Sequence, residues 1–297
     1  MAKELVRFDW AMKRLLRQKS NFVILEGLIS ELLKEDVTIQ QILDGESNQE
    51  TNDDKFNRVD ILALNSQNEL VIIEVQNTKQ YDYFHRMLYG ASKATAEHLA
   101  LGKPYSEIKK VYSINIVYFD LGQGEDYVYY GKANFVGIHQ GDVLGLSDTQ
   151  KELFGKEEVY QLFPEYYVVK VNNFNDLAKD TLDEWVYYLK NDEVLKDAKA
   201  KGLQQVAEHL KIQRLTDAEK RDYYREIDNT RMAKSVLDTA RIDGIAQGIA
   251  QGIAEGKAEE KLAVVRNLLA QTDLSLQTIA QVAAVPISFV QKVKDGL

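Results

Sequence analysis

The chain has 297 residues, enough for one large domain or for a domain with an extension, and its hydrophobic content of 45% supports a real core. It contains no cysteine, which excludes disulfides and thiolate metal sites and fits a reducing cytoplasm. The net charge of −9 argues against a protein that coats nucleic acid through charge alone, although a local basic cleft with bound cations is compatible with an enzyme acting on nucleic acid.

The first part of the chain predicts helices followed by a β-hairpin. Residues 7–34 carry a helical apolar stripe, and the polar run 45–57 indicates a loop. Two aliphatic segments, 59–64 and 69–76, flank a polar turn at 65–68, which is the pattern of an antiparallel hairpin.

The middle of the chain predicts a long helix and then more strands. Residues 80–101 have a helical pattern that ends at Gly102, with Pro104 just beyond. The nearly continuous apolar run 111–119 predicts a buried central strand. Helices are expected after Asn175, and further strands are expected over 127–130, 134–138 and 166–171. This succession predicts an α/β fold.

The last third changes character. Thr216 and Glu219 have capping-box spacing before a long helix, within which residues 244–256 repeat the tetrad Gly-Ile-Ala-Gln. The repeat has two interpretations, a flexible linker or a helical seam through which copies of the chain associate. We favour the seam, and hence a homo-oligomer, because isoleucine recurs in register and glycine lets helix backbones approach closely.

Two short helices around a tight turn are predicted over residues 275–296. DNA-reading helix-turn-helix motifs have this pattern, and so do structural helix pairs; few Arg or Lys residues stand at base-reading positions. We place the main domain at residues 1–225 and a helical extension at 226–297.

No membrane or export signal is expected. The N-terminus has charges throughout and no apolar run of signal-peptide length, and no window approaches 18 uninterrupted apolar residues. We therefore expect a cytoplasmic protein without a membrane span.

Asp60, Glu74 and Gln76 lie on segments that otherwise resemble buried strands. Burying a carboxylate without a partner is costly, and a divalent cation best explains two acids placed so close together. Because strand side chains alternate, Glu74 and Gln76 share a face with Leu70 and Ile72, and the hairpin can bring Asp60 beside them. Hard oxygen ligands suit Mg²⁺ or Mn²⁺.

Such a cation could polarise a scissile phosphate, and positive side chains would then stabilise the transition state. The basic candidates for phosphate contact around the hairpin are Lys55, Arg58, Lys79, Arg86 and Lys93. The structural alternative is that Asp60 begins a strand in a polar turn and that Glu74 pairs with Arg58 or Lys55. The four histidines are scattered, and no nucleophile–base pair supports a small-molecule hydrolase.

Several segments together resemble a known family. Residues 55–60 (KFNRVD) and 73–76 (IEVQ), separated by the hairpin, are similar to the PD-(D/E)XK nuclease superfamily, and most closely to its Rpn-type branch of recombination-promoting nucleases and transposases. Supporting matches, within a resemblance that covers roughly residues 5–225, are 8–13 (FDWAMK), 83–89 (YFHRMLY), 102–105 (GKPY) and 111–119.

The resemblance implies a restriction-endonuclease-like, four-stranded mixed sheet flanked by helices, and metal-dependent hydrolysis of DNA. Asp60 and Glu74 match the two metal-binding acids, and Gln76 stands where the superfamily usually has lysine. Glu26, on an early helix, matches an additional acid of many members, although a solvated helix acid is the simpler interpretation.

The sequence therefore predicts a Mg²⁺- or Mn²⁺-dependent DNA endonuclease that acts in recombination or transposition. The alternative is a catalytically weak or inactive DNA-binding or assembly protein that retains the nuclease fold, because glutamine at position 76 leaves the charge-stabilising role unassigned.

Overall fold

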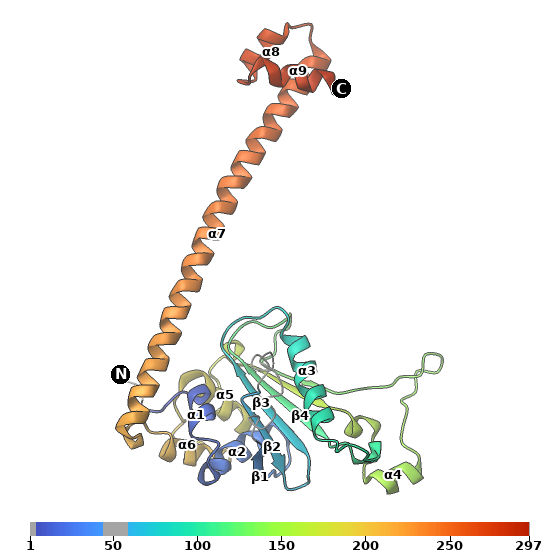
Figure 1. Ribbon diagram of the computed structural model, residues 1–297, viewed down its shortest axis with the longest axis vertical. Helices are drawn as coiled ribbons and strands as arrows, with labels where there is room; N and C mark the ends of the chain where they lie inside the picture. Colours follow the sequence, from blue (N-terminus) through green and yellow to red (C-terminus); the bar gives the residue numbers. More distant parts are fainter. Residues whose placement is uncertain (1–3, 44–58, 297) are drawn as a thin grey trace. The chain divides into compact units, whose positions relative to one another are not determined.

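A six-stranded mixed sheet in the order β1-β2-β3-β4-β6-β5 forms the centre of the first part of the chain, as far as the structure describes it (Figure 1). The structure is a computed structural model and describes residues 4–43 and 59–296. It divides into two units, Met1–Tyr223 and Tyr224–Leu297. The strands are β1 Ile39–Leu43, β2 Ile61–Asn65, β3 Leu70–Gln76, β4 Val111–Val117, β5 Val128–Gly131 and β6 Glu165–Lys170.

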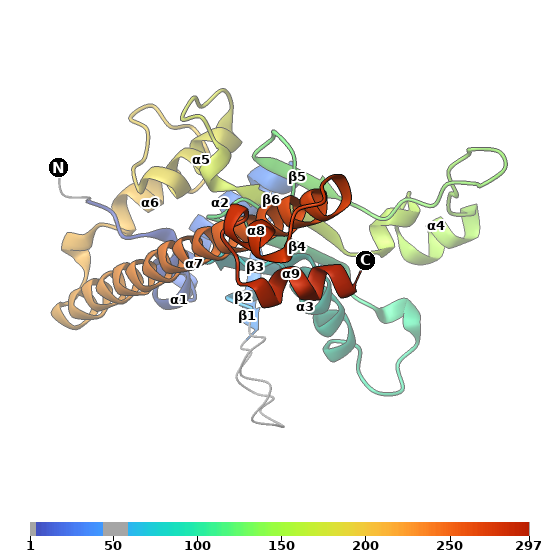
Figure 2. The same ribbon diagram turned by 90° about the horizontal axis from the view of Figure 1, so that it is seen from above.

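Helices cover both faces of this sheet. Helix α3 lies on one face, and α1, α2, α5 and α6 lie on the other (Figure 2). The helices are α1 Phe8–Arg14, α2 Phe22–Leu33, α3 Tyr83–Glu97, α4 Asp148–Phe154, α5 Thr181–Asn191, α6 Leu203–His209, α7 Asp217–Gln271, α8 Leu276–Val282 and α9 Ile287–Asp295. Short 3-10 turns occur at Lys19–Asn21, Tyr105–Glu107, Val159–Leu162, Val171–Asn173 and Ile212–Arg214. This is the restriction-endonuclease-like α/β arrangement that the sequence predicts.

The predicted hairpin is confirmed. Strands β2 and β3 pair antiparallel with Ile61 opposite Ile73, and β3, β4 and β6 run parallel. Leu70 and Ile72 pack with Ala91 and Ala94 of α3, so this face of β3 is the one that α3 covers. The alternate residues of β3 point to the face that α2 covers, because strand side chains alternate.

Helix α2 approaches the segment before α6 so closely that only glycine fits. A Cβ on Gly27 would lie 2.0 Å from the Lys201 carbonyl oxygen, and Gly202 has a φ of +88°. Trp185 of α5 closes this crossing by donating its indole N–H to the same carbonyl at 3.1 Å. Helices α2 and α5 are therefore fixed to the segment before α6 by contacts with its backbone.

Three details of the sheet differ from the sequence predictions. The four-stranded sheet implied by the resemblance is wrong, because six strands pair in the described chain. Strand β1 was missed because its two consecutive glutamines, Gln40 and Gln41, belong to an exposed edge strand. Residues 134–138 form no strand; they pair only through an isolated bridge between Val136 and Val143, in a loop that leaves Ile138 exposed.

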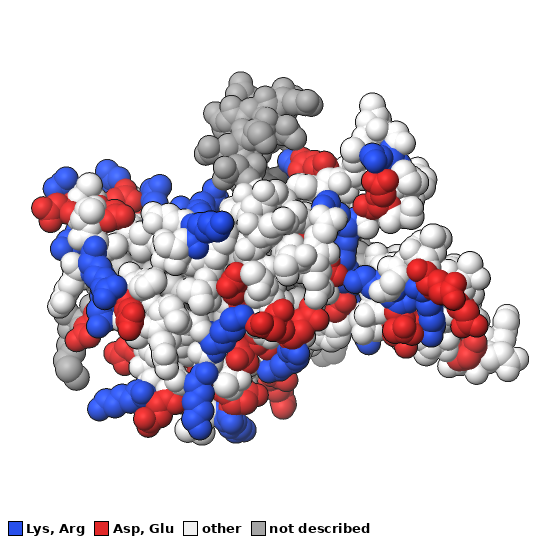
Figure 3. Space-filling model, turned by 90° about the horizontal axis from the view of Figure 1, so that it is seen from below, with Lys and Arg blue, Asp and Glu red and all other residues white. Residues whose placement is uncertain are grey.

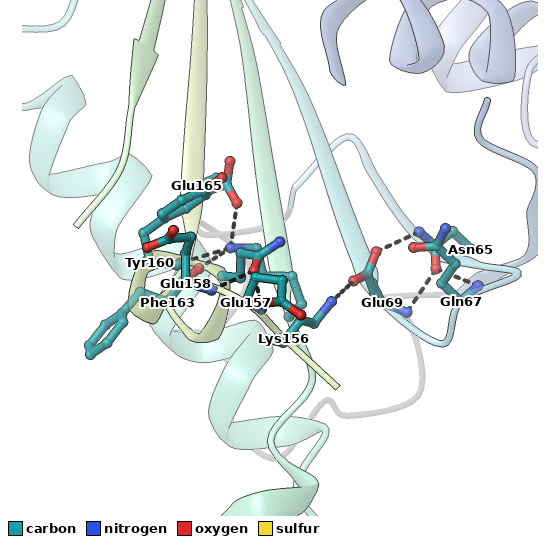
Figure 4. A network of polar contacts seen from close by, with 11 residues as sticks. Asn65, Gln67, Glu69, Lys156, Glu157, Glu158, Tyr160, Phe163 and Glu165 are labelled. Carbon is teal, nitrogen blue, oxygen red and sulfur yellow. Dashed lines mark hydrogen bonds and ion pairs between the residues drawn. The ribbon is translucent and has the colours of Figure 1, made fainter. Parts of the chain in front are cut away.

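Two buried ion pairs close one end of the sheet, where β3, β4 and β6 begin (Figure 4). Lys110 lies 2.6 Å from Glu165, with side chains only 3% and 7% exposed, and Lys156 lies 2.8 Å from Glu69. Burial lowers the pKa of Lys110, and the hydrogen bond to Glu165 opposes that effect. Each buried acid at this end therefore has its own lysine.

Helix α7 begins at the end of the first unit and continues into the second unit, whose described elements are all helices. The capping box before α7 is confirmed, because Thr216 N–H donates to Glu219 at 2.8 Å and Glu219 N–H donates to the Thr216 hydroxyl at 3.3 Å. The two helices predicted at 275–296 are α8 and α9, which pack on the end of α7 through Val265, Ile279 and Val290. None of the described helices is long and apolar enough to cross a membrane.

Candidate active site

Asp60 and Glu74 project from neighbouring positions on one face of the sheet. Asp60 directly precedes β2, and the pairing of Ile61 with Ile73 places it opposite Glu74. Leu62 and Ile72 belong to the cluster under α3, so Asp60 and Glu74, each two residues away along its strand, point to that same face. The Asp60 carboxylate also accepts the N–H of Val75 at 2.7 Å. The two acids therefore converge.

Desolvation dominates the electrostatics of both acids. Burial raises the pKa of Asp60, while the Val75 N–H and the positive charges of Lys13 and Arg86 oppose the shift. Burial also raises the pKa of Glu74; Arg86 opposes this shift, and the negative charge of Asp60 adds to it. Two carboxylates that have lost water and repel each other create a demand for positive charge.

Arg86 meets part of this demand. One of its terminal nitrogens lies 3.2 Å from the Glu74 carboxylate, while its buried Nε has no hydrogen-bond partner in the structure. Tyr83, one turn earlier on α3, donates to the Asn115 side chain at 3.4 Å, and burial next to Glu74 raises the pKa of its hydroxyl. Among the described residues that the sequence suggested for phosphate contact, Arg86 is thus placed against an acid of this pair.

The remaining sequence candidates make other contacts or fall outside the described residues. Gln76 shares the face of Glu74, and its amide donates to the Thr78 carbonyl at 3.2 Å. Lys93 lies about 10 Å along α3 from Arg86 and pairs with Glu97 at 3.6 Å. Lys79 lies over the Tyr81 ring, 5.1 Å from its centroid. Lys55 and Arg58 fall outside the described residues.

Glu26 is placed at the other end of β2. Its carboxylate accepts the N–H of Ile39 at 2.8 Å, and Ile39 pairs with Asn65. Four strand steps, about 13 Å, separate Asn65 from Ile61 and hence from the position beside Asp60. The structure thus gives Glu26 a backbone-binding role at the start of β1 and does not bring it to the acid pair.

Helix α1 supplies neighbours that the sequence analysis did not assign to the site. Lys13 and Asp9 both influence the pKa of Asp60, and Arg17 donates to the Asp60 carbonyl at 2.7 Å. Asp9 is held by Arg7 at 2.7 Å and by the Asn77 amide at 2.7 Å. One sequence feature could have identified these neighbours: Asp9 and Lys13 are four residues apart and so share one helix face. Both lie within residues 8–13, which contribute to the family resemblance.

The donor set suits a hard cation. No group of three or more His, Cys, Asp or Glu side chains that could hold a metal ion occurs in the part of the chain that the structure describes. Mg²⁺ does not need such a group, because it is usually bound through one or two carboxylates, with waters and substrate phosphate completing the octahedron. Asp60 and Glu74 supply that number of carboxylates on one face.

Comparison with known proteins identifies the family of the chain. The family model described as "PD-(D/E)XK nuclease family transposase" matches residues 6–240, which contain the whole sheet and the acid pair. No curated protein and no solved structure matches the chain. The match covers well over half of the sequence, and the chain therefore belongs to the PD-(D/E)XK nuclease family of transposases.

Proposed function

We propose that the protein is a Mg²⁺- or Mn²⁺-dependent DNA endonuclease that acts in DNA recombination or transposition in the cytoplasm. The observation that carries the proposal is the convergence of Asp60 and Glu74, two desolvated acids on one face of the sheet with Arg86 alongside. Family membership supports a nuclease-type function, and the oxygen donors fit a hard cation.

The side chains divide the work in the following way. Asp60 and Glu74 would hold the cation, which would supply Lewis-acid chemistry by polarising the scissile phosphate and lowering the pKa of a nearby water. The N–H of Val75 fixes one oxygen of Asp60, and Arg86 fixes one oxygen of Glu74, so both acids are oriented before substrate arrives.

Lys13 is our candidate for the positive charge that glutamine at position 76 does not supply. It is an exposed side chain whose charge acts on Asp60, and it enters from α1 instead of from β3. A fixed cation close to the reacting phosphate stabilises the charge that develops in the transition state. The family's usual lysine function is thus transferred to a different element.

Asp60→Asn should abolish cleavage of supercoiled plasmid by purified protein with Mg²⁺ or Mn²⁺, a loss of roughly 100-fold or more, because a ligand to the cation is lost. Gel analysis of nicked and linear products measures the rate. The matched control is Glu107→Gln, which neutralises an exposed acid that pairs with Lys103, and it should cut like wild type.

Equal cutting by wild type and Asp60→Asn would show that this pair is not the active site. Salt-sensitive DNA binding without cleavage, unaffected by a chelator, would instead support the alternative of a non-catalytic DNA-binding protein with a nuclease fold. The neutralisation of Glu74 by Arg86 is the observation that favours that alternative.

Lys13→Ala should slow cleavage by about 10-fold or more, because positive charge near the developing phosphate charge is removed. Lys19→Ala removes another exposed lysine of the same region and should leave the rate unchanged. Single-turnover rates at saturating cation distinguish a role in the chemical step from one in cation binding. Equal rates for the two variants would refute the assignment of Lys13.

The raised pKa of Asp60 predicts how stability depends on pH and cation. Because the folded state holds the Asp60 proton more tightly than the unfolded state, the free energy of unfolding falls as pH rises from the unfolded pKa, about 4, through the raised folded pKa. Asp60→Asn removes this loss, so at pH 7 without divalent cation the variant should have a higher Tm than wild type.

Added Mg²⁺ should reverse that order. A bound cation stabilises the folded wild type by about 2.7 kcal/mol at a concentration of 100 Kd, and the variant should gain much less. Differential scanning fluorimetry with and without a chelator measures both effects. A wild type whose Tm does not respond to Mg²⁺ or Mn²⁺ would count against a cation site at this pair.

We also propose that the protein is a homo-oligomer that associates through the repeat in α7. Ile245, Ile249 and Ile253 are 53%, 59% and 55% exposed, and a Cβ on any of the neighbouring glycines would meet no atom within 4 Å. An isolated helix loses about 1 kcal/mol per glycine relative to alanine, so packing must compensate. A second copy of the same repeat offers isoleucines at the matching spacing.

Ile249→Glu combined with Ile253→Glu should reduce the mass measured by light scattering, because charge on the isoleucine stripe opposes its burial between copies. Gln247→Glu with Gln251→Glu adds the same two charges to another face of the same helix and should leave the mass unchanged. A monomeric wild type, or equal masses for both double variants, would show that the repeat does not mediate association.

A further inference from the structure

An apolar pocket of about 360 Å³ lies on the same face of the sheet as the acid pair. Its wall is Phe84, Met87 and Leu88 of α3, and the strands β5 and β6 contribute Tyr129, Tyr166 and Val168. No lining residue is charged. The pocket is therefore suited to a flat apolar group and unsuited to phosphate itself.

The strand registers connect this pocket to the acids. Asp60 lies opposite Glu74, Glu74 pairs with Asn115, Asn115 pairs with Val168, and Val168 pairs with Tyr129. These residues form one row across the sheet, on the face that α3 covers. Neighbouring strands are about 4.8 Å apart, so Val168 is about 10 Å and Tyr129 about 14 Å from Glu74 along the row.

Helix α3 joins the two ends of the row. Tyr83 and Arg86 face the acids, while Phe84 and Leu88 face the pocket. Phe84 and Leu88 are 54% and 58% exposed, so the wall is accessible from solvent. A DNA strand advances about 3.4 Å per nucleotide in a duplex. The distance of about 10 to 14 Å from Glu74 to Val168 and Tyr129 therefore corresponds to roughly three or four nucleotide steps.

The aromatic side chains that line the pocket indicate which kind of group it can bind. Aromatic side chains bind nucleobases by stacking on their π-faces, which is tolerant of sequence. Tyr129 and Tyr166 pack within the sheet and also present surface to this pocket. A base inside a duplex has both faces covered by its neighbours, so only an unpaired or flipped base can enter.

On the basis of the nuclease function above, we propose that the pocket receives an unpaired DNA base a few nucleotides from the phosphate that the acid pair cleaves. The substrate is then DNA with a single-stranded or flipped nucleotide beside the cleavage site. Phe84 is the stacking residue, because it is the aromatic side chain that α3 places at the solvent-accessible wall.

The test uses full-length Asp60→Asn protein, in which the proposed cleavage is blocked, and single-stranded DNA that contains 2-aminopurine. Stacking should quench the 2-aminopurine fluorescence, and binding should be tighter than to the fully paired duplex. Phe84→Ala should weaken binding to the single strand by roughly 5- to 150-fold, and Phe84→Trp should restore it. Leu153→Ala, which truncates an exposed apolar residue of α4, is the control and should bind normally.

The outcomes separate this proposal from the proposed function. If protein with intact Asp60 cuts DNA in a metal-dependent manner but Phe84→Ala binds single strands as tightly as its parent, the base pocket is refuted and the nuclease stands. Quenching that depends on Phe84, without any cleavage by the wild type, supports the pocket and refutes the nuclease. A change in the light-scattering mass caused by Phe84→Ala would identify the pocket as a protein interface and overturn the proposal.

Discussion

The burial of two like charges beside each other is the constraint on which the candidate active site depends. Asp60 and Glu74 lose hydration on the face of the sheet that α3 covers, and this burial raises the pKa of both carboxyl groups. The negative charge of Asp9 raises the pKa of Asp60 further, and that of Asp60 raises the pKa of Glu74 further. Such an arrangement costs free energy unless positive charge compensates it. The ion pair of Arg86 with Glu74 at 3.2 Å compensates part of the cost. The remaining demand is what the proposed cation would meet.

The two ends of the sheet show why this pair is distinctive. Where β3, β4 and β6 begin, Glu69 and Glu165 are also buried, but Lys156 and Lys110 each neutralise one of them (Figure 4). At the other end, Arg86 bonds directly to Glu74, while the Asp60 carboxylate accepts a backbone N–H from Val75. Acidic and basic side chains are also mixed over the surface seen in Figure 3, so the net charge of −9 gives little information about any one site. Local pairing therefore distinguishes the site better than total charge does.

The sequence predicts what depends on local alternation and misses what depends on docking. The hairpin and the shared face of Leu70, Ile72 and Glu74 follow from a period of two, and the structure has both. The neighbours from α1 could not be derived in this way, because the place where a helix docks is set by contacts far apart in sequence. The same reason explains Glu26, whose helix directs it to Ile39. Strand β1 was missed because an edge strand tolerates glutamine.

Helix α3 determines how the acids and the apolar pocket are related in space. Within two turns of α3, Tyr83 and Arg86 point towards Glu74, whereas Phe84 and Leu88 point across the neighbouring strands to the apolar pocket. Ala91 and Ala94, further along the helix, fix it on Leu70 and Ile72. Because α3 is packed rigidly on the hydrogen-bonded sheet, the distance between the acid pair and the apolar pocket cannot change unless the helix moves. The distance from the acids to the aromatic wall is therefore a property of the fold, and a substrate that uses both must match it.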